Sequence, residues 1–156
     1  FNENKFLTEY KKYNYYDFQG STWAPTLVHK NVWNKVNGFS EEYFPGNGSD
    51  PDFNMKLWNI GIRIFKGINN CKVYHFVSVV TERINIPSKN KMNIRSKAHK
   101  IFLLKWGISI KFFKKFYLKT NSKYSGPLTI PKKDPIYLFN LLLCKFHYIY
   151  TKLIYN

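Results

Sequence analysis

The strongest constraint on this chain is the uneven distribution of its charged residues. Residues 1–88 carry ten Lys or Arg against eight Asp or Glu, a net charge of +2. Residues 89–156 carry fifteen Lys or Arg against a single acid, Asp134, a net charge of +14. A change of this kind along a chain is typical of two units with different surroundings. We therefore expect a balanced globular piece over 1–88 and a basic, aromatic-rich extension over 89–156.

The composition of the chain excludes several classes of protein. Hydrophobic residues make up 44% and aromatic residues 19% of the 156 positions, which excludes an ordinary disordered tail. Two cysteines, Cys71 and Cys144, are too few for a disulfide framework or a cysteine zinc cluster, and we expect reduced thiols in the cytoplasm. The chain has no uninterrupted apolar run of about 18 residues, as a transmembrane helix would require.

The excess of positive charge suggests nucleic-acid binding, but the type of cation argues against it. Of the 25 cationic residues, 22 are Lys and only three are Arg, the residue that carries most bidentate recognition of bases and phosphates. We therefore expect no nucleic-acid partner. A non-catalytic basic module that binds a membrane surface or nucleic acid is retained as the alternative function.

Hydrophobic spacing and turn residues predict the elements of the chain. A short helix is expected over 30–36, stopped by Asn37-Gly38, and a second is expected from Ser49-Asp50-Pro51-Asp52 to Gly61, with Ser49 or Asp50 as its N-cap. Residues 22–28 are expected to form a loop that enters a short strand, and further short strands are expected at 62–65 and 72–76, which gives an α/β or α+β order. Beyond residue 90 we expect three helices, over 101–108, 110–117 and 136–154.

Four of the nine acids gather in one segment. Glu41, Glu42, Asp50 and Asp52 lie within twelve residues of one another. Acids at a helix start are favoured by the helix dipole, which is a structural explanation. The same acids suit a metal site, a cation site or the abstraction of a proton, and the two explanations are compatible. His75 follows one helix and one hairpin later, a distance that lets the chain return and bring His75 near Asp50.

Several motifs in one order extend this pattern. They are Gly38-Phe39-Ser40-Glu41-Glu42, Ser49-Asp50-Pro51-Asp52-Phe53, Gly61-Ile62-Arg63-Ile64, Val73-Tyr74-His75-Phe76 and Lys105-Trp106-Gly107. Together they resemble the acceptor-side half of family 2 glycosyltransferases, which often carry GGFDE, EDxD, a strand ending in YH, and KWG. The resemblance covers roughly residues 20–107. It implies an α/β, partial GT-A-like fold over 1–88, followed by a mainly helical basic extension over 89–156.

The resemblance also assigns site residues, one position at a time. Asp50 matches the catalytic base of inverting members, which deprotonates the acceptor hydroxyl. His75 matches the residue that in many members helps to hold a divalent metal, Mn²⁺ or Mg²⁺, on the sugar diphosphate. Asp52 matches the second acid of EDxD, which supports the helix start and the acceptor side. The remaining residues expected to border the acceptor are Trp23, Gly46 and Asn47.

The resemblance finally implies partners and a location. The donor would be a nucleotide-sugar and the acceptor a glycan or a lipid-linked molecule, as in the synthesis of a surface polysaccharide. Few residues precede the matched region, so we expect a nucleotide-binding half upstream and an inactive isolated piece. The basic extension, with Trp106, Phe112, Phe113, Phe116 and Tyr117 among its lysines, predicts peripheral contact with an anionic membrane from the cytoplasmic side. The alternative is that these aromatic residues pack back on the catalytic domain and that the lysines are merely solvated.

Overall fold

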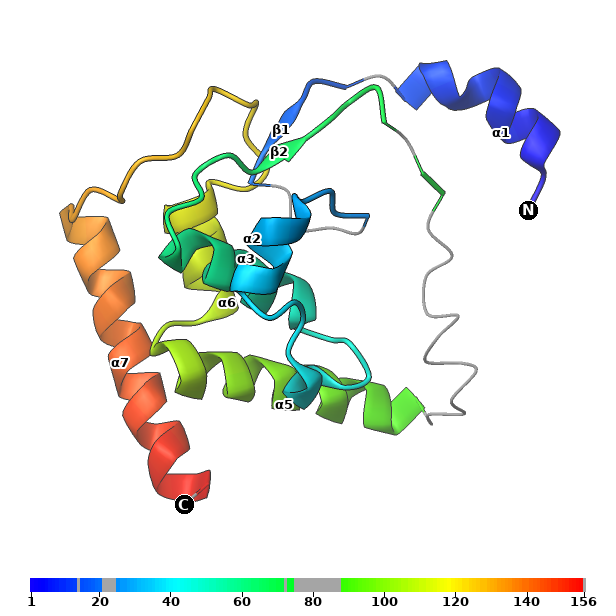
Figure 1. Cartoon of the computed structure of the whole chain (residues 1–156). Helices are drawn as coiled ribbons and strands as arrows, with labels where there is room; N and C mark the ends of the chain where they lie inside the picture. The colour runs from blue at the N-terminus through cyan, green and yellow to red at the C-terminus, as the bar shows by residue number, and fades with distance from the viewer. Residues whose placement is uncertain (14, 21–24, 72, 75–87, 156) are drawn as a thin grey trace.

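The chain folds into a helix-rich structure with a small antiparallel sheet (Figure 1). This computed structural model describes residues 1–13, 15–20, 25–71, 73–74 and 88–155. The fold is therefore mixed α and β, as the sequence predicts at this coarse level. Its helices are α1 (Glu3–Glu9), the 3₁₀ turns η1 (Tyr10–Tyr13) and η2 (Glu41–Tyr43), α2 (Lys30–Lys35), α3 (Ser49–Asn59), α5 (Ser88–Trp106), α6 (Ile110–Phe112), the π-helical η3 (Phe113–Leu118) and α7 (Pro135–Tyr155).

The predicted helices are present, but their bounds and one cap need correction. The helix predicted over 101–108 is the end of the longer α5, and the one predicted over 110–117 is divided into α6 and η3. Asn37 and Gly38 both take positive φ after α2, and Gly61 does so after α3, so the predicted stop signals end these helices. The N-cap of α3, however, is Gly48 in a left-handed conformation, and the prediction of Ser49 or Asp50 as the cap is wrong. The Ser49 hydroxyl donates instead to the carbonyl oxygen of Gly46, at 2.7 Å, and so closes the preceding loop.

The sheet lies where the sequence did not indicate it. Strand β1 (Phe18–Gln19) pairs antiparallel with β2 (Lys66–Gly67), and Phe18 also bridges to Lys123. No strand is present at 62–65 or at 25–28, the described part of the segment predicted over 22–28, and the prediction over 72–76 lies mostly outside the described residues. Residues 62–65 are used differently: the Ile62 amide donates to the Leu57 carbonyl and closes the end of α3.

One hydrophobic core contains residues from both sides of residue 88. Phe53 of α3 is buried together with Phe102 of α5 and with Phe113 and Leu118 of η3. Burying an aromatic or leucine side chain of this size stabilises a fold by about 1.5–3 kcal/mol. The core therefore joins residues from both sides of residue 88, where the net charge of the sequence changes.

The aromatic residues expected at a membrane are packed inside the protein. Phe112 and Phe113 are buried, and the other three, Trp106, Phe116 and Tyr117, are partly buried against the same core. Their prediction as a membrane-facing set is wrong. The reason is helical spacing, because the turn that carries Phe112 and Phe113 inward leaves Lys111 and Lys115 exposed.

Helix α7 lies along one side of the molecule and passes the C-terminal end of α5 (Figure 1). Asp134, the single acid after residue 88, caps it: the Asp134 carboxylate accepts from the Tyr137 amide at 2.7 Å. A buried seam of Tyr137, Cys144 and Thr151, seven residues apart, faces the core. Among the described residues, no helix combines the length and the apolar character needed to cross a bilayer.

Candidate functional site

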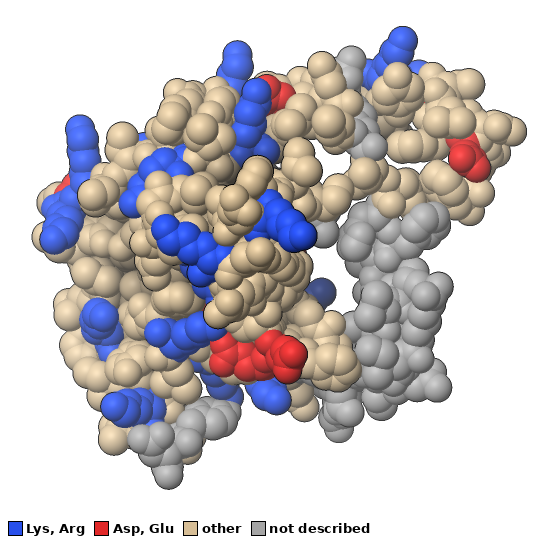
Figure 2. Space-filling view, viewed as in Figure 1, with Lys and Arg blue, Asp and Glu red and all other residues tan. Residues whose placement is uncertain are grey.

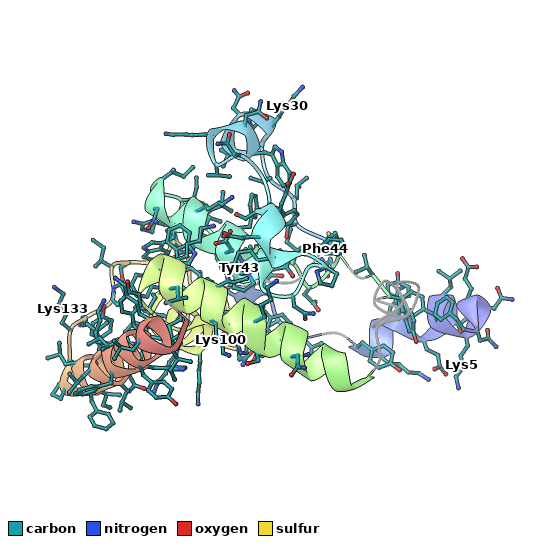
Figure 3. The ribbon with its side chains drawn as sticks, turned by 90° about the horizontal axis from the view of Figure 1, so that it is seen from below. Lys5, Lys30, Tyr43, Phe44, Lys100 and Lys133 are labelled. Atoms are coloured by element: carbon teal, nitrogen blue, oxygen red, sulfur yellow. The ribbon has the colours of Figure 1, made fainter. Side chains whose placement is uncertain are left out.

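The predicted site residues that the structure describes lie around the start of α3. The turn η2 and the loop 44–48 lead into this helix, and Tyr43, the last residue of η2, lies beside α5 (Figure 3). Gly48 makes the close approach feasible: a Cβ at this position would stand 2.9 Å from the Tyr43 ring and 3.1 Å from the Ala98 Cβ of α5. Its φ of 86° also disfavours any residue with a side chain.

Asp52 is the centre of a buried hydrogen-bond network. Its side chain is 0% exposed, and its carboxylate accepts from Ser40 Oγ at 2.7 Å and from Tyr43 Oη at 3.3 Å. From α5 it accepts from Trp106 Nε1 at 2.7 Å, and Lys105 Nζ lies 3.0 Å from its Oδ1. Five groups, counting Lys56 Nζ at 4.0 Å, therefore surround one buried carboxylate. We call Asp52 and these five residues the Asp52 network.

Lys105 connects this network to the surface acids. Its ammonium donates to Glu42 Oε1 at 2.6 Å and to Ser40 Oγ at 3.1 Å. Burial favours the neutral amine, but the hydrogen bonds to Glu42 and Asp52 outweigh it and raise the Lys105 pKa. Burial, reinforced by the charges of Asp52 and Glu42, strongly raises the pKa of Tyr43. Tyr43 therefore remains a neutral donor, and Lys105 remains a cation, at physiological pH.

Asp50 occupies a different position from Asp52. It is partly buried in the first turn of α3, and residues two apart on a helix project about 200° away from each other. The two side chains therefore project toward different sides of α3. The contacts of Asp52 are those of a residue that supports the helix start, whereas Asp50 keeps a share of its surface toward solvent.

The loop before α3 has the remaining acceptor candidates that the structure describes. Gly46 is exposed, with φ at 124° and open space around its missing Cβ, and Asn47 is partly buried. The Gly46 amide donates to the Tyr43 carbonyl at 2.6 Å, which ties this loop to the Asp52 network. Both residues thus lie on the same loop, immediately before Asp50.

Two predicted residues, Trp23 and His75, lie outside the described residues. The proximity of His75 to Asp50 and the place of Trp23 beside the acceptor therefore stay predictions. Within the described part of the chain, no three His, Cys, Asp or Glu side chains gather as metal ligands. The oxygens of Asp52 are already engaged by hydrogen-bond donors. These residues alone do not fit a divalent ion, and no step proposed below passes through one.

The sequence indicated the acids of this site but not their partners. Lys105 and Trp106 belong to a motif that the resemblance quotes, yet their contact with Asp52 spans more than fifty positions. A buried acid within a cation-rich chain was the available signal, since such an acid needs a partner. The pattern did not show which of the 25 cations would supply it.

Comparisons with known proteins identified no relative of this chain. No protein-family model, curated protein or solved structure matches this chain.

Proposed function

We propose that this chain is the acceptor-side part of an inverting glycosyltransferase related to family 2. The reaction would move a sugar from a nucleotide-sugar to an acceptor hydroxyl. Asp50 would accept the proton of that hydroxyl as its oxygen attacks the anomeric carbon, and the nucleoside diphosphate would leave. The GT-A-like fold, the dependence on a divalent metal and the role of His75 are parts of the same proposal.

The observation that supports this proposal most is the convergence of the motifs. Three of them are separated along the chain: the Gly38–Glu42 segment, the Asp50-Pro51-Asp52 segment and Lys105-Trp106-Gly107. Side chains from all three meet in the Asp52 network, through Ser40, Asp52 and Trp106. Chance matches to short motifs would have no reason to lie within hydrogen-bond distance of one another.

In this proposal the Asp52 network fixes the position of the catalytic base. It anchors the first turn of α3 to α5, and Asp50 belongs to that turn. A catalytic base must be held within hydrogen-bond reach of the proton that it removes, so a rigid helix start favours catalysis. The dipole of α3 favours the ionised form of an acid at this place.

The test is a pair of variants in the full-length gene product, assayed with nucleotide-sugar donors. Asp50→Asn keeps the shape of the side chain and removes its basicity, and we expect turnover to fall by at least about 10²-fold while donor binding persists. Glu3→Gln, the corresponding change at an exposed acid outside the acid cluster, should retain turnover. Near-normal turnover of Asp50→Asn would refute the assignment of the base.

A second candidate is a basic module without catalysis. It is favoured by the surface of the region after residue 88, where exposed lysines and an exposed apolar helix lie together. A change in the protein's spectrum on addition of a nucleoside diphosphate with Mn²⁺ would favour the transferase. Salt-sensitive binding to single-stranded RNA, without that change, would favour the module.

A further inference from the structure

Helix α7 has an apolar face that nothing in the described chain covers. Its mean hydropathy is high, and most of its large apolar side chains are exposed. At 100° per residue these side chains form a continuous arc of roughly 160° opposite the buried seam. The exposed members are Ile136, Leu138, Phe139, Leu142, Leu143, Phe146, Ile149, Tyr150, Leu153 and Ile154. We call them the α7 arc.

Polar residues border the α7 arc on both sides. Lys145 and Lys152 lie along one edge, and Asn140 and His147 lie along the other. A wide apolar face between polar edges is typical of a helix that lies in the plane of a membrane surface. The lysines would then stand at the depth of the lipid phosphates.

A basic hollow opens beside this arc. Its volume is about 560 Å³, within the range of ligand-binding pockets, and it lies between α5, α6, η3 and α7. Lys111, Lys114 and Lys115 line it, together with His99, Ser109 and His147. None of the described residues that line the hollow is acidic. Its chemistry therefore suits an anion with several oxygens, such as a phosphate.

His147 lies where the hollow meets the α7 arc. It lines the hollow, and it also shares one side of α7 with the exposed side chains of Leu143 and Tyr150, four residues before it and three after. A phosphate in the hollow would therefore leave attached acyl chains next to the α7 arc. A free phosphate would use the hollow and leave the arc without a role.

We propose that the hollow binds the phosphate of an anionic lipid whose acyl chains contact the α7 arc. Charge favours this occupant over a second copy of the chain. Each copy carries a net charge of +16, and an α7-to-α7 dimer would bring its lysine edges together. Figure 2 shows Lys and Arg side chains spread over one face of the protein and acids confined to a few places, as expected for attraction to an anionic surface. This inference does not rest on the transferase proposal.

The test uses the full chain and vesicles of phosphatidylglycerol mixed with phosphatidylcholine, with vesicles of pure phosphatidylcholine for comparison. Lys111→Gln combined with Lys115→Gln should lower the affinity for anionic vesicles roughly 30-fold. Lys5→Gln combined with Lys11→Gln removes the same charge from exposed positions on α1 and η1, and should lower affinity severalfold less. Equal losses for the two pairs would overturn the site, since they would indicate general attraction alone.

A second pair of variants tests the apolar part. Leu142→Ser combined with Phe146→Ser changes exposed side chains, so folding should be retained and vesicle binding should fall at least tenfold. Unchanged vesicle binding would overturn the contact with acyl chains. Equal binding to pure phosphatidylcholine would overturn the role of the anion.

A titration with inorganic phosphate tests the other occupants. If phosphate alone fully inhibits vesicle binding at low millimolar concentration, the hollow is assigned to free phosphate. If Leu142→Ser combined with Phe146→Ser abolishes a dimer and vesicle binding is retained, the α7 arc is assigned to a second copy of the chain.

Discussion

The Asp52 network and the hollow beside the α7 arc differ in what surrounds their charged side chains. In the network, a fully buried acid is surrounded by two hydroxyls, an indole and two ammonium groups, and its Lys105 partner is shared with Glu42. On the α7 side, lysines and histidines surround a hollow whose described lining has no acid. Paired and buried polar groups make a fold specific, whereas cations at a surface hollow with no acid in its described lining attract an anionic ligand. The comparison assigns stability to the first region and binding to the second.

The largest effect is expected from the centre of the network. Asp52→Ala leaves the donors of Ser40, Tyr43 and Trp106 without this acceptor, while Lys105 keeps its hydrogen bond to Glu42. Breaking a buried pair in this way costs about 3 kcal/mol or more of the free energy of unfolding. Urea denaturation at neutral pH measures this loss.

The matched control for this prediction is Glu42→Gln. Glu42 contacts the same lysine, but its side chain is 46% exposed, so its contribution is about 1 kcal/mol or less. A loss of stability in Asp52→Ala no greater than that in Glu42→Gln would show that the network does not depend on its buried centre.

A smaller effect is expected at alkaline pH, from a tyrosine pair near α7. Tyr117 Oη lies 3.4 Å from Tyr137 Oη, and burial together with this hydrogen bond raises the pKa of Tyr117 to about 12. An unfolded tyrosine ionises near pH 10, so the unfolded state releases its proton first and stability falls as the pH rises from about 10 to 12. Between pH 9 and pH 11 the loss attributable to Tyr117 is on the order of 1 kcal/mol.

Tyr117→Phe checks this prediction, because it removes the titrating group and keeps the ring. The variant should lose less stability than the unmodified chain over the same pH interval, in paired urea titrations at pH 9 and pH 11. Identical losses in both proteins would place the alkaline sensitivity elsewhere.

The two regions also differ in how far the sequence predicts them. The helices followed from local signals: α2 and α3 end at Gly or Asn residues that take positive φ, and α7 shows a long apolar period. The predictions of strands were wrong because a two-residue strand such as β1 has no sequence pattern to detect. Its pairing with β2 also depends on residues almost fifty positions away. Local pattern is informative where neighbours in sequence are neighbours in space.

The same reasoning separates the site residues. Asp50 and Asp52 were evident as acids in a basic chain, but their different surroundings depend on which side of α3 meets α5. The hollow could not be predicted at all, since His99 and His147 come from separate helices. The interleaved aromatic residues were misassigned because an alternation of lysine and phenylalanine is equally compatible with a membrane face and with a packed helix.

The most direct measurement compares two lysines, one from each region, by two readouts. Lys105→Met should lower the free energy of unfolding by about 1.5–3 kcal/mol, since it removes hydrogen bonds to charged groups, and should leave affinity for anionic vesicles within about twofold. Lys111→Met should change the free energy of unfolding by less than about 0.5 kcal/mol and lower vesicle affinity about fivefold. If both substitutions alter both quantities alike, or if the two effects are exchanged, the division of charge into a stabilising region and a binding region is contradicted.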